Sequence, residues 1–214
     1  MKNALPLCRR GLLAVLPAVL IAGCATPPPK DEVTPKLYGG ASKEVALSVI
    51  DFRSYVLSGD KTPKFEGTVR SSGIPITVNR PGRPSEETFA DLLADMIREG
   101  LAGSGVSAKV VKVPAGSANA IAVKSMAATG ANRYIIMRVN ESKWDGAFNF
   151  RHVYDLTLFV TSRDGTVLGS KTLAGDEARK ASDKYNVFDM HSVAYKELVE
   201  SLFADPSIRQ ALQQ

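Results

Sequence analysis

The chain has 214 residues, of which 44% are hydrophobic and 23% are charged, a composition typical of one globular domain. This composition excludes collagen-like, wholly disordered and polytopic membrane proteins. The net charge of +5 is concentrated at the start, because three basic residues and no acidic residue lie within the first 23 positions. The rest of the chain carries only +2, so its charge does not predict a nucleic-acid partner.

Residues 1–23 have the features of a cleaved signal peptide. An apolar stretch that is too short to span a bilayer comfortably follows three basic residues, Lys2, Arg9 and Arg10. The stretch ends in Ile21-Ala22-Gly23-Cys24, which resembles the lipobox of bacterial lipoproteins. The resemblance implies that Cys24 is acylated and anchors the protein to a membrane. The alternative is a plain secretory leader followed by a chance cysteine.

Cys24 is the only cysteine after the leader, since Cys8 lies within it. Acylation of Cys24 therefore leaves no thiol for a disulfide, a cysteine nucleophile or a cysteine ligand of a metal. The next residue is Ala25, whereas an aspartate at this position favours retention in the inner membrane of diderm bacteria. We therefore expect a lipid-anchored protein of the outer membrane, on its periplasmic face.

A tether is predicted over residues 24–43, because prolines at positions 27–29 and 35 and the pair Gly39-Gly40 oppose regular structure. A single periplasmic domain is predicted over residues 44–214. This organisation gives three parts: signal peptide, tether and folded domain.

The domain is expected to begin with a strand, in which Val45, Leu47 and Val49 form one well-buried face. The long segment 53–84 is interrupted by glycine and proline. Within it, residues 68–78 are rich in β-formers, which predicts an irregular hairpin or edge ribbon.

Ser85 is the predicted N-cap of the helix that follows, and Gly103 marks its expected end. A strand is predicted over residues 109–113, where Pro114 stops it. An alanine-rich segment at 117–129 predicts a second helix with Gly130 as its stop.

Three strands and two helices complete the domain. Strands are predicted over residues 133–139 and 150–161, and Asp164-Gly165 predicts a hairpin to the strand 166–173. A long helix follows, and Asp205-Pro206 starts a last short helix. We therefore expect an α+β (mixed α/β) fold: a single mixed sheet with helices packed on it, and a C-terminal meander followed by helices.

The layout resembles the YajG-type family of outer-membrane lipoproteins. The features that carry the resemblance are Cys24-Ala25-Thr26-Pro27-Pro28 after the leader, the strand 151–160 with its hairpin partner, and the closing Asp205-Pro206-Ser207-Ile208. A basic ribbon around Phe65 to Val78 departs from the pattern of the shorter members of the family. The resemblance implies an envelope location and a non-enzymatic role, and no catalytic residue follows from it.

No motif in the chain predicts a reaction, a metal or a cofactor. The only histidines are His152 and His191, whereas a zinc site needs three or four ligands. Both histidines lie on predicted apolar faces, so packed or hydrogen-bonded side chains are expected. A hydrolase in which Asp155 or Asp189 orients a histidine is an alternative, although no Gly-x-Ser-x-Gly sequence is present.

The basic ribbon at residues 53–84 is the candidate binding segment, because it carries six cations against two acids. The alternative is a solvated loop whose charges protect a sheet edge. We expect a non-enzymatic structural or interaction module that binds an envelope protein or an anionic envelope polymer. An accessory lipoprotein that binds a ligand for lipid or solute transport is the alternative. The candidate binding residues are Arg70, Arg80, Arg83 and Trp144.

Overall fold

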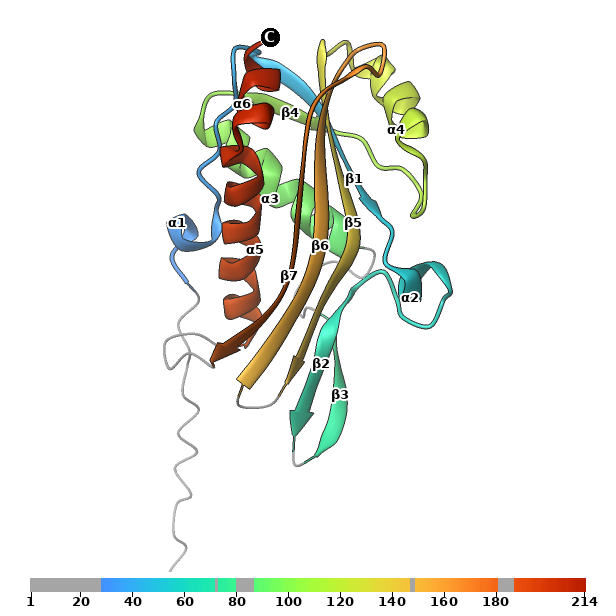
Figure 1. The fold of residues 1–214 in the computed structure, drawn as a ribbon, viewed down its shortest axis with the longest axis vertical. Coiled ribbons are helices and arrows are strands. Elements are labelled where there is room, and N and C mark those ends of the chain that lie inside the picture. Colours follow the sequence, from blue (N-terminus) through green and yellow to red (C-terminus); the bar gives the residue numbers. More distant parts are fainter. Residues whose placement is uncertain (1–27, 72, 80–86, 147–148, 181–186) are drawn as a thin grey trace, which may run out of the picture.

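The computed structural model describes residues 28–71, 73–79, 87–146, 149–180 and 187–214. Within these ranges the strands form one seven-stranded mixed sheet, with helices packed on it (Figure 1). The predicted fold class is confirmed. The strands are β1 (Glu44–Asp51), β2 (Phe65–Ser71), β3 (Ile74–Asn79), β4 (Ser107–Val110), β5 (Arg133–Gly146), β6 (Asn149–Ser162) and β7 (Val167–Lys180).

Helices cover both faces of the sheet unequally. The larger core lies between one face and the helices α3, α5 and α6, whereas α4 packs on the other face. None of the helices in the described ranges is long and apolar enough to span a membrane. The helices are α1 (Lys30–Val33), α2 (Ser54–Leu57), α3 (Phe89–Gly103), α4 (Asn119–Met126), α5 (Val187–Ala204) and α6 (Pro206–Gln213), with a 3-10 turn at Ala127–Thr129.

β1 lies inside the sheet, where it pairs in parallel with β4 on one side and with β5 on the other. Every residue of β1 except Glu44 is buried. The expectation of one buried face is therefore corrected. Helix α3 covers the face that carries Leu47, and α4 covers the face that carries Ile50, so both faces lie in a core.

β5 changes its partner part-way along its length. It pairs with β1 as far as Val139 and, after an irregularity between Val139 and Glu141, with β2 from Trp144 to Gly146. β2 forms an antiparallel hairpin with β3, which is an edge strand. The edge ribbon predicted over residues 68–78 is confirmed, and Figure 1 shows it projecting from one end of the domain.

β5, β6 and β7 form the predicted antiparallel meander. In the β6–β7 turn, Asp164 Oδ1 accepts the backbone N–H of Thr166 at 3.0 Å. Gly165 has a φ of +91°, a left-handed conformation that glycine adopts without steric cost. β7 continues to Lys180, beyond the predicted end at Leu173.

The N-cap of α3 is Thr88, and the prediction of Ser85 is wrong. The hydroxyl of Thr88 accepts the N–H of Asp91 at 3.1 Å, and Asp91 Oδ2 accepts the N–H of Thr88 at 2.9 Å. This reciprocal capping box satisfies two backbone donors, which explains why the helix begins at Phe89. The predicted cap Asp205 of α6 is confirmed, since it accepts the N–H of Ser207.

The folded body begins before the predicted boundary at Glu44. The backbone N–H of Lys36 donates to Glu200 on α5 at 2.8 Å, and Leu37 is a buried member of the main core. The N–H of Ala41 donates to the carbonyl of Leu212 at 3.1 Å. The segment predicted to be a tether over residues 24–43 therefore packs on the domain from Lys30 onward.

Candidate functional site

A cluster of stacked rings lies between the β5–β6 pair and α5. Trp144 on β5 stacks with His152 on β6 at a centroid distance of 4.1 Å, and with His191 on α5 at 4.2 Å. Trp144 Nε1 donates to the hydroxyl of Tyr195 at 3.0 Å. Phe89 on α3 lies edge-on to Tyr195, so the cluster joins two helices to the sheet.

Trp144 is 1% exposed, which contradicts its prediction as a binding residue. Its cross-strand neighbour is His152, and α5 covers the same face. A side chain enclosed in this way stabilises the domain and offers no surface to a partner. The expectation that both histidines are packed is confirmed, because each is fully buried.

The environments of the two histidines differ. Nδ1 of His191 lies 3.3 Å from Oε2 of Glu66, which is 2% exposed on β2. Neither ring nitrogen of His152 has a hydrogen-bond partner within the described ranges. Burial, with smaller contributions from His191 and Arg179, lowers the pKa of His152 to about 3. His152 is therefore neutral at ordinary pH, and no nucleophile or orienting acid of the described residues lies within hydrogen-bond distance of it.

A second buried polar group, not predicted from the sequence, is Arg53. Its Nε and Nη2 donate to the two carboxylate oxygens of Asp51 at 2.9 and 2.7 Å. Nη1 donates to the carbonyls of Phe65 at 2.5 Å and Ser142 at 3.4 Å. Nη2 also donates to the carbonyl of Pro63 at 3.2 Å.

Arg53 lies beside the part of β5 between Val139, where the pairing with β1 ends, and Trp144, where the pairing with β2 begins. The planar guanidinium provides donors to backbone carbonyls of both neighbouring segments, Phe65 on β2 and Ser142 on β5. The guanidinium also lies over the Phe89 ring, 4.6 Å from its centroid. The arrangement is a structural clamp that fixes the base of the β2–β3 hairpin.

The candidate cations of the ribbon are only partly described. Arg70 is exposed and makes two contacts with Asp145 on β5, Nε to Oδ1 at 3.2 Å and Nη2 to Oδ2 at 3.1 Å. Arg80 and Arg83 lie outside the described residues. Arg70 therefore helps to hold the hairpin against β5, and its charge is balanced there.

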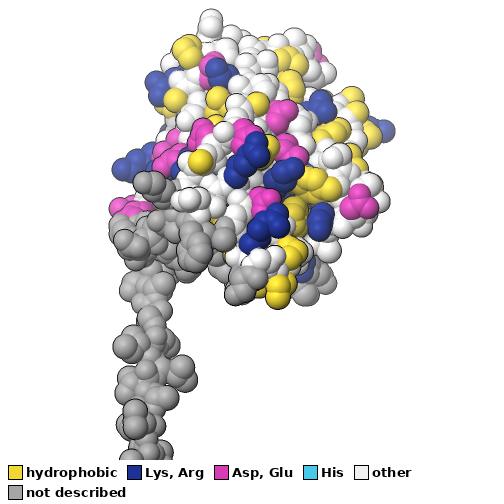
Figure 2. All heavy atoms as spheres, turned by 60° about the horizontal axis from the view of Figure 1, so that its bottom comes forward, with side chains coloured by type: hydrophobic (Ala, Val, Ile, Leu, Met, Phe, Trp, Pro, Cys, Tyr) yellow, Lys and Arg dark blue, Asp and Glu magenta, His cyan; other side chains and the backbone are white. Residues whose placement is uncertain are grey.

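The hairpin carries exposed hydrophobic side chains. Ile74 is 66% exposed and Ile76 is 51% exposed, whereas Val78 on the same strand is buried. Figure 2 looks toward this end of the molecule and shows hydrophobic side chains next to clusters of Lys, Arg, Asp and Glu. The hairpin therefore offers apolar surface at its tip, where the sequence indicated a basic surface.

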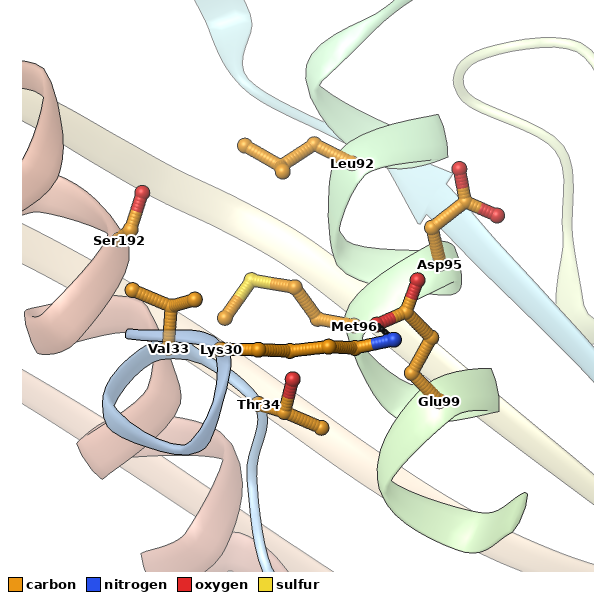
Figure 3. A pocket seen from close by; sticks show the side chains of 8 residues that line it. All are labelled: Lys30, Val33, Thr34, Leu92, Asp95, Met96, Glu99 and Ser192. Atoms are coloured by element: carbon orange, nitrogen blue, oxygen red, sulfur yellow. Dashed lines mark ion pairs between the residues drawn. The ribbon is translucent and has the colours of Figure 1, made fainter. Parts of the chain in front are cut away.

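A hollow of about 140 Å³ lies between α1, α3 and α5 (Figure 3). The ion pair between Lys30 and Glu99, at 3.4 Å, lies across it. A neighbouring hollow of about 270 Å³ lies along the segment that contains Leu37. Both are smaller than the about 300 Å³ at which ligand pockets usually begin. Within the described ranges, no group of three or more His, Cys, Asp or Glu side chains is placed to hold a metal ion.

No family model matches the chain, and no curated protein matches it. Several solved structures are similar at low identity. A DUF330 protein from Xanthomonas campestris has 15% identity and a TM-score of 0.48, over 80% of this chain and 88% of that one. The PelC dodecamer from Paraburkholderia phytofirmans has 14% identity and a TM-score of 0.42, over 80% and 94%.

The lipoprotein GNA1162 from Neisseria meningitidis has 11% identity and a TM-score of 0.40, over 75% of this chain and 94% of that one. These proteins share neither enough sequence nor enough backbone geometry with this chain for a function to be transferred. The resemblance to the YajG-type family stays a prediction.

Proposed function

We propose that the protein is a lipid-anchored lipoprotein of the bacterial outer membrane, and that it acts there as a non-enzymatic binding module. The sequence Ile21-Ala22-Gly23-Cys24 carries this proposal, since it combines a lipobox-like pattern with the only cysteine after the leader. The lipid anchor would then lie four residues before Pro28, where the described part of the chain begins.

The packing of the N-terminal segment supports a domain held close to the bilayer. Four residues span at most about 14 Å when fully extended. Residues from Lys30 onward are fixed to α3 and α5 through Glu99, Glu200 and the core position of Leu37. An anchor this short confines the domain to the membrane surface and raises its effective concentration near other envelope components.

The burial of His152 argues against a reaction in which this histidine is the general base. A general base must reach the proton that it abstracts. The side chain of His152 is fully buried and has no hydrogen-bond partner within the described ranges. Its pKa is lowered to about 3, so it does not fit the role of a general base. His152 packs against Trp144 as a core side chain does.

The anchor is tested by Cys24→Ala, compared with Cys8→Ala in the leader as a matched control. We expect Cys24→Ala to abolish incorporation of radiolabelled palmitate and to release the protein from the membrane fraction. Cys8→Ala should retain both properties, because the signal peptidase removes that residue. Unchanged palmitate labelling and membrane fractionation of Cys24→Ala would refute the proposal.

A further inference from the structure

We propose that the tip of the β2–β3 hairpin inserts Ile74 and Ile76 into the bilayer leaflet that holds the acyl chains of Cys24. The inference rests on the proposed lipid anchor and assigns a lipid surface as the partner of the hairpin. Two observations carry it: an apolar strip that continues outward from the core, and the span of only four residues from Cys24 to Pro28, where the described part of the chain begins.

The apolar strip follows from the alternation of side chains along β3. Ile74, Ile76 and Val78 share one face, because every second residue of a strand points the same way. Val78 is 6% exposed, Ile76 is 51% exposed and Ile74 is 66% exposed. Exposure therefore rises from the base of the hairpin to its tip, and the apolar face continues outward from the core.

The strip lies on the same side of the sheet as α1, the first described element of the chain. Val69 pairs with Ile76 across the hairpin and packs against the main core, which α3 and α5 cover. α1, the first described element, packs on the same helices, as the contact of Lys30 with Glu99 and the hollow in Figure 3 show. The chain thus enters the domain on the same side of the sheet as the exposed isoleucines.

The length of the tether limits the distance between this side and the bilayer. Cys24 is four residues before Pro28, a span of at most about 14 Å. The short span from Cys24 to Pro28 therefore keeps the domain close to the membrane surface. Burial of exposed apolar side chains in the interface is favourable, and the tether removes most of the entropic cost of reaching it.

The opposite face of the hairpin sets the depth of insertion. Thr68 and Thr77 pair across the strands there, and Arg70 lies opposite Pro75. β3 is an edge strand, and unpaired backbone groups are costly in hydrocarbon. The amphipathic ribbon therefore lies at the level of the head groups, with only the isoleucine side chains entering the acyl region.

The test is a fluorescent label at the tip of the hairpin in the full, lipidated protein. Ile74→Cys provides the only free thiol, because the leader with Cys8 is removed and Cys24 is acylated. An environment-sensitive nitrobenzoxadiazole label there should show a blue shift in vesicles of phosphatidylethanolamine and phosphatidylglycerol. Lipids that carry a nitroxide on the acyl chain should quench it. The reference is the same label on Ile74→Cys protein that also carries Cys8→Ala and Cys24→Ala, so that the label again has one thiol to react with, without vesicles.

Val167→Cys is the matched control, since Val167 is 52% exposed and begins β7 at the end of the sheet away from the hairpin (Figure 1). Its label should keep an aqueous emission in vesicles. An aqueous emission from the Ile74 label in the reconstituted protein would overturn the inference. A blue shift in the reference protein that grows with concentration would also overturn it, because a second copy would then cover the hairpin.

The failure of this inference can be told apart from the failure of the anchor. Mass spectrometry of the N-terminal peptide shows whether Cys24 carries acyl chains. An unmodified Cys24 refutes the proposed function, and this inference with it. An acylated Cys24 together with an aqueous Ile74 label refutes the hairpin insertion alone.

Discussion

Trp144 and His152 are cross-strand neighbours on β5 and β6, and their rings stack 4.1 Å apart with planes that differ by 9°. Both side chains are almost completely buried. The imidazole of His152 is therefore shielded from water by the indole of Trp144. It makes no hydrogen bond within the described ranges. Burial of this stack favours the neutral form of His152.

This neutrality predicts loss of stability in mild acid. The pKa of His152 is lowered from 6.5 to about 3 in the folded protein. Between pH 6.5 and pH 3 this histidine is therefore protonated in the unfolded chain and neutral in the folded chain. The stabilisation is complete above pH 6.5 and is lost as the pH falls toward 3. At about 1.4 kcal/mol per pH unit, the free energy of unfolding should fall by roughly 2 kcal/mol between pH 6.5 and 5 from this group alone.

His152→Phe isolates this contribution, because phenylalanine keeps the stack and has no titrating group. The variant should be at least as stable as the parent at pH 7, and should lose roughly 2 kcal/mol less between pH 6.5 and 5. Urea unfolding of the Cys24→Ala protein, followed by the fluorescence of the single Trp144, measures both values. Parallel pH profiles of parent and variant would contradict the assignment.

Arg53→Met is expected to destabilise the domain strongly. It leaves Asp51 as an uncompensated buried charge and removes the donor that Nη1 provides to the carbonyl of Phe65. Breaking a buried ion pair on one side typically costs about 3–5 kcal/mol. Arg70→Met is the matched control, because Arg70 also contacts an aspartate through two nitrogens but is about half exposed.

The control should cost less than about 1 kcal/mol, as exposed ion pairs do. Urea unfolding of the two variants side by side gives the comparison. Equal losses for Arg53→Met and Arg70→Met would show that the clamp at the β1–β5–β2 junction is not structural.

Removal of the N-terminal segment tests where the folded body begins. A chain that starts at Glu44, the boundary expected from the sequence, lacks Leu37 and the hydrogen bond from Lys36 to Glu200. Loss of a buried leucine alone costs about 2–5 kcal/mol. The chain that starts at Glu44 should therefore unfold at lower urea than one that starts at Pro28. The same midpoint for both would mean that the segment only rests on the surface.

The sequence predicts elements well where the hydrophobic pattern is local and regular. The alternation from Phe150 to Val160 identified β6 and its buried face, including His152. The burial of Trp144 does not follow from the sequence, because the pairing irregularity between Val139 and Glu141 breaks the alternation that precedes it. Arg53 follows a strand and resembled a loop cation, although its position two residues after Asp51 is compatible with the buried pair. The docking of Leu37 depends on helices far along the chain, which no local pattern shows.

The attachment of the hairpin to the sheet depends on Gly67. A Cβ at this position would lie 2.2 Å from the carbonyl oxygen of Trp144, so a side chain cannot enter without moving backbone. Gly67→Ala should cost about 1–3 kcal/mol, as overpacking does, and should weaken the β2–β5 pairing. Gly103→Ala is the control, since Gly103 lies in α3 with no atom within 4 Å of the added carbon. Gly103→Ala should be neutral or stabilising by up to about 1 kcal/mol.

Hydrogen exchange measures the local effect of Gly67→Ala. The backbone amides of β2 should lose protection in this variant, while those of β6 should keep it. Unchanged protection of β2 would show that the hairpin is held by Arg53 and Arg70 without the strand contact.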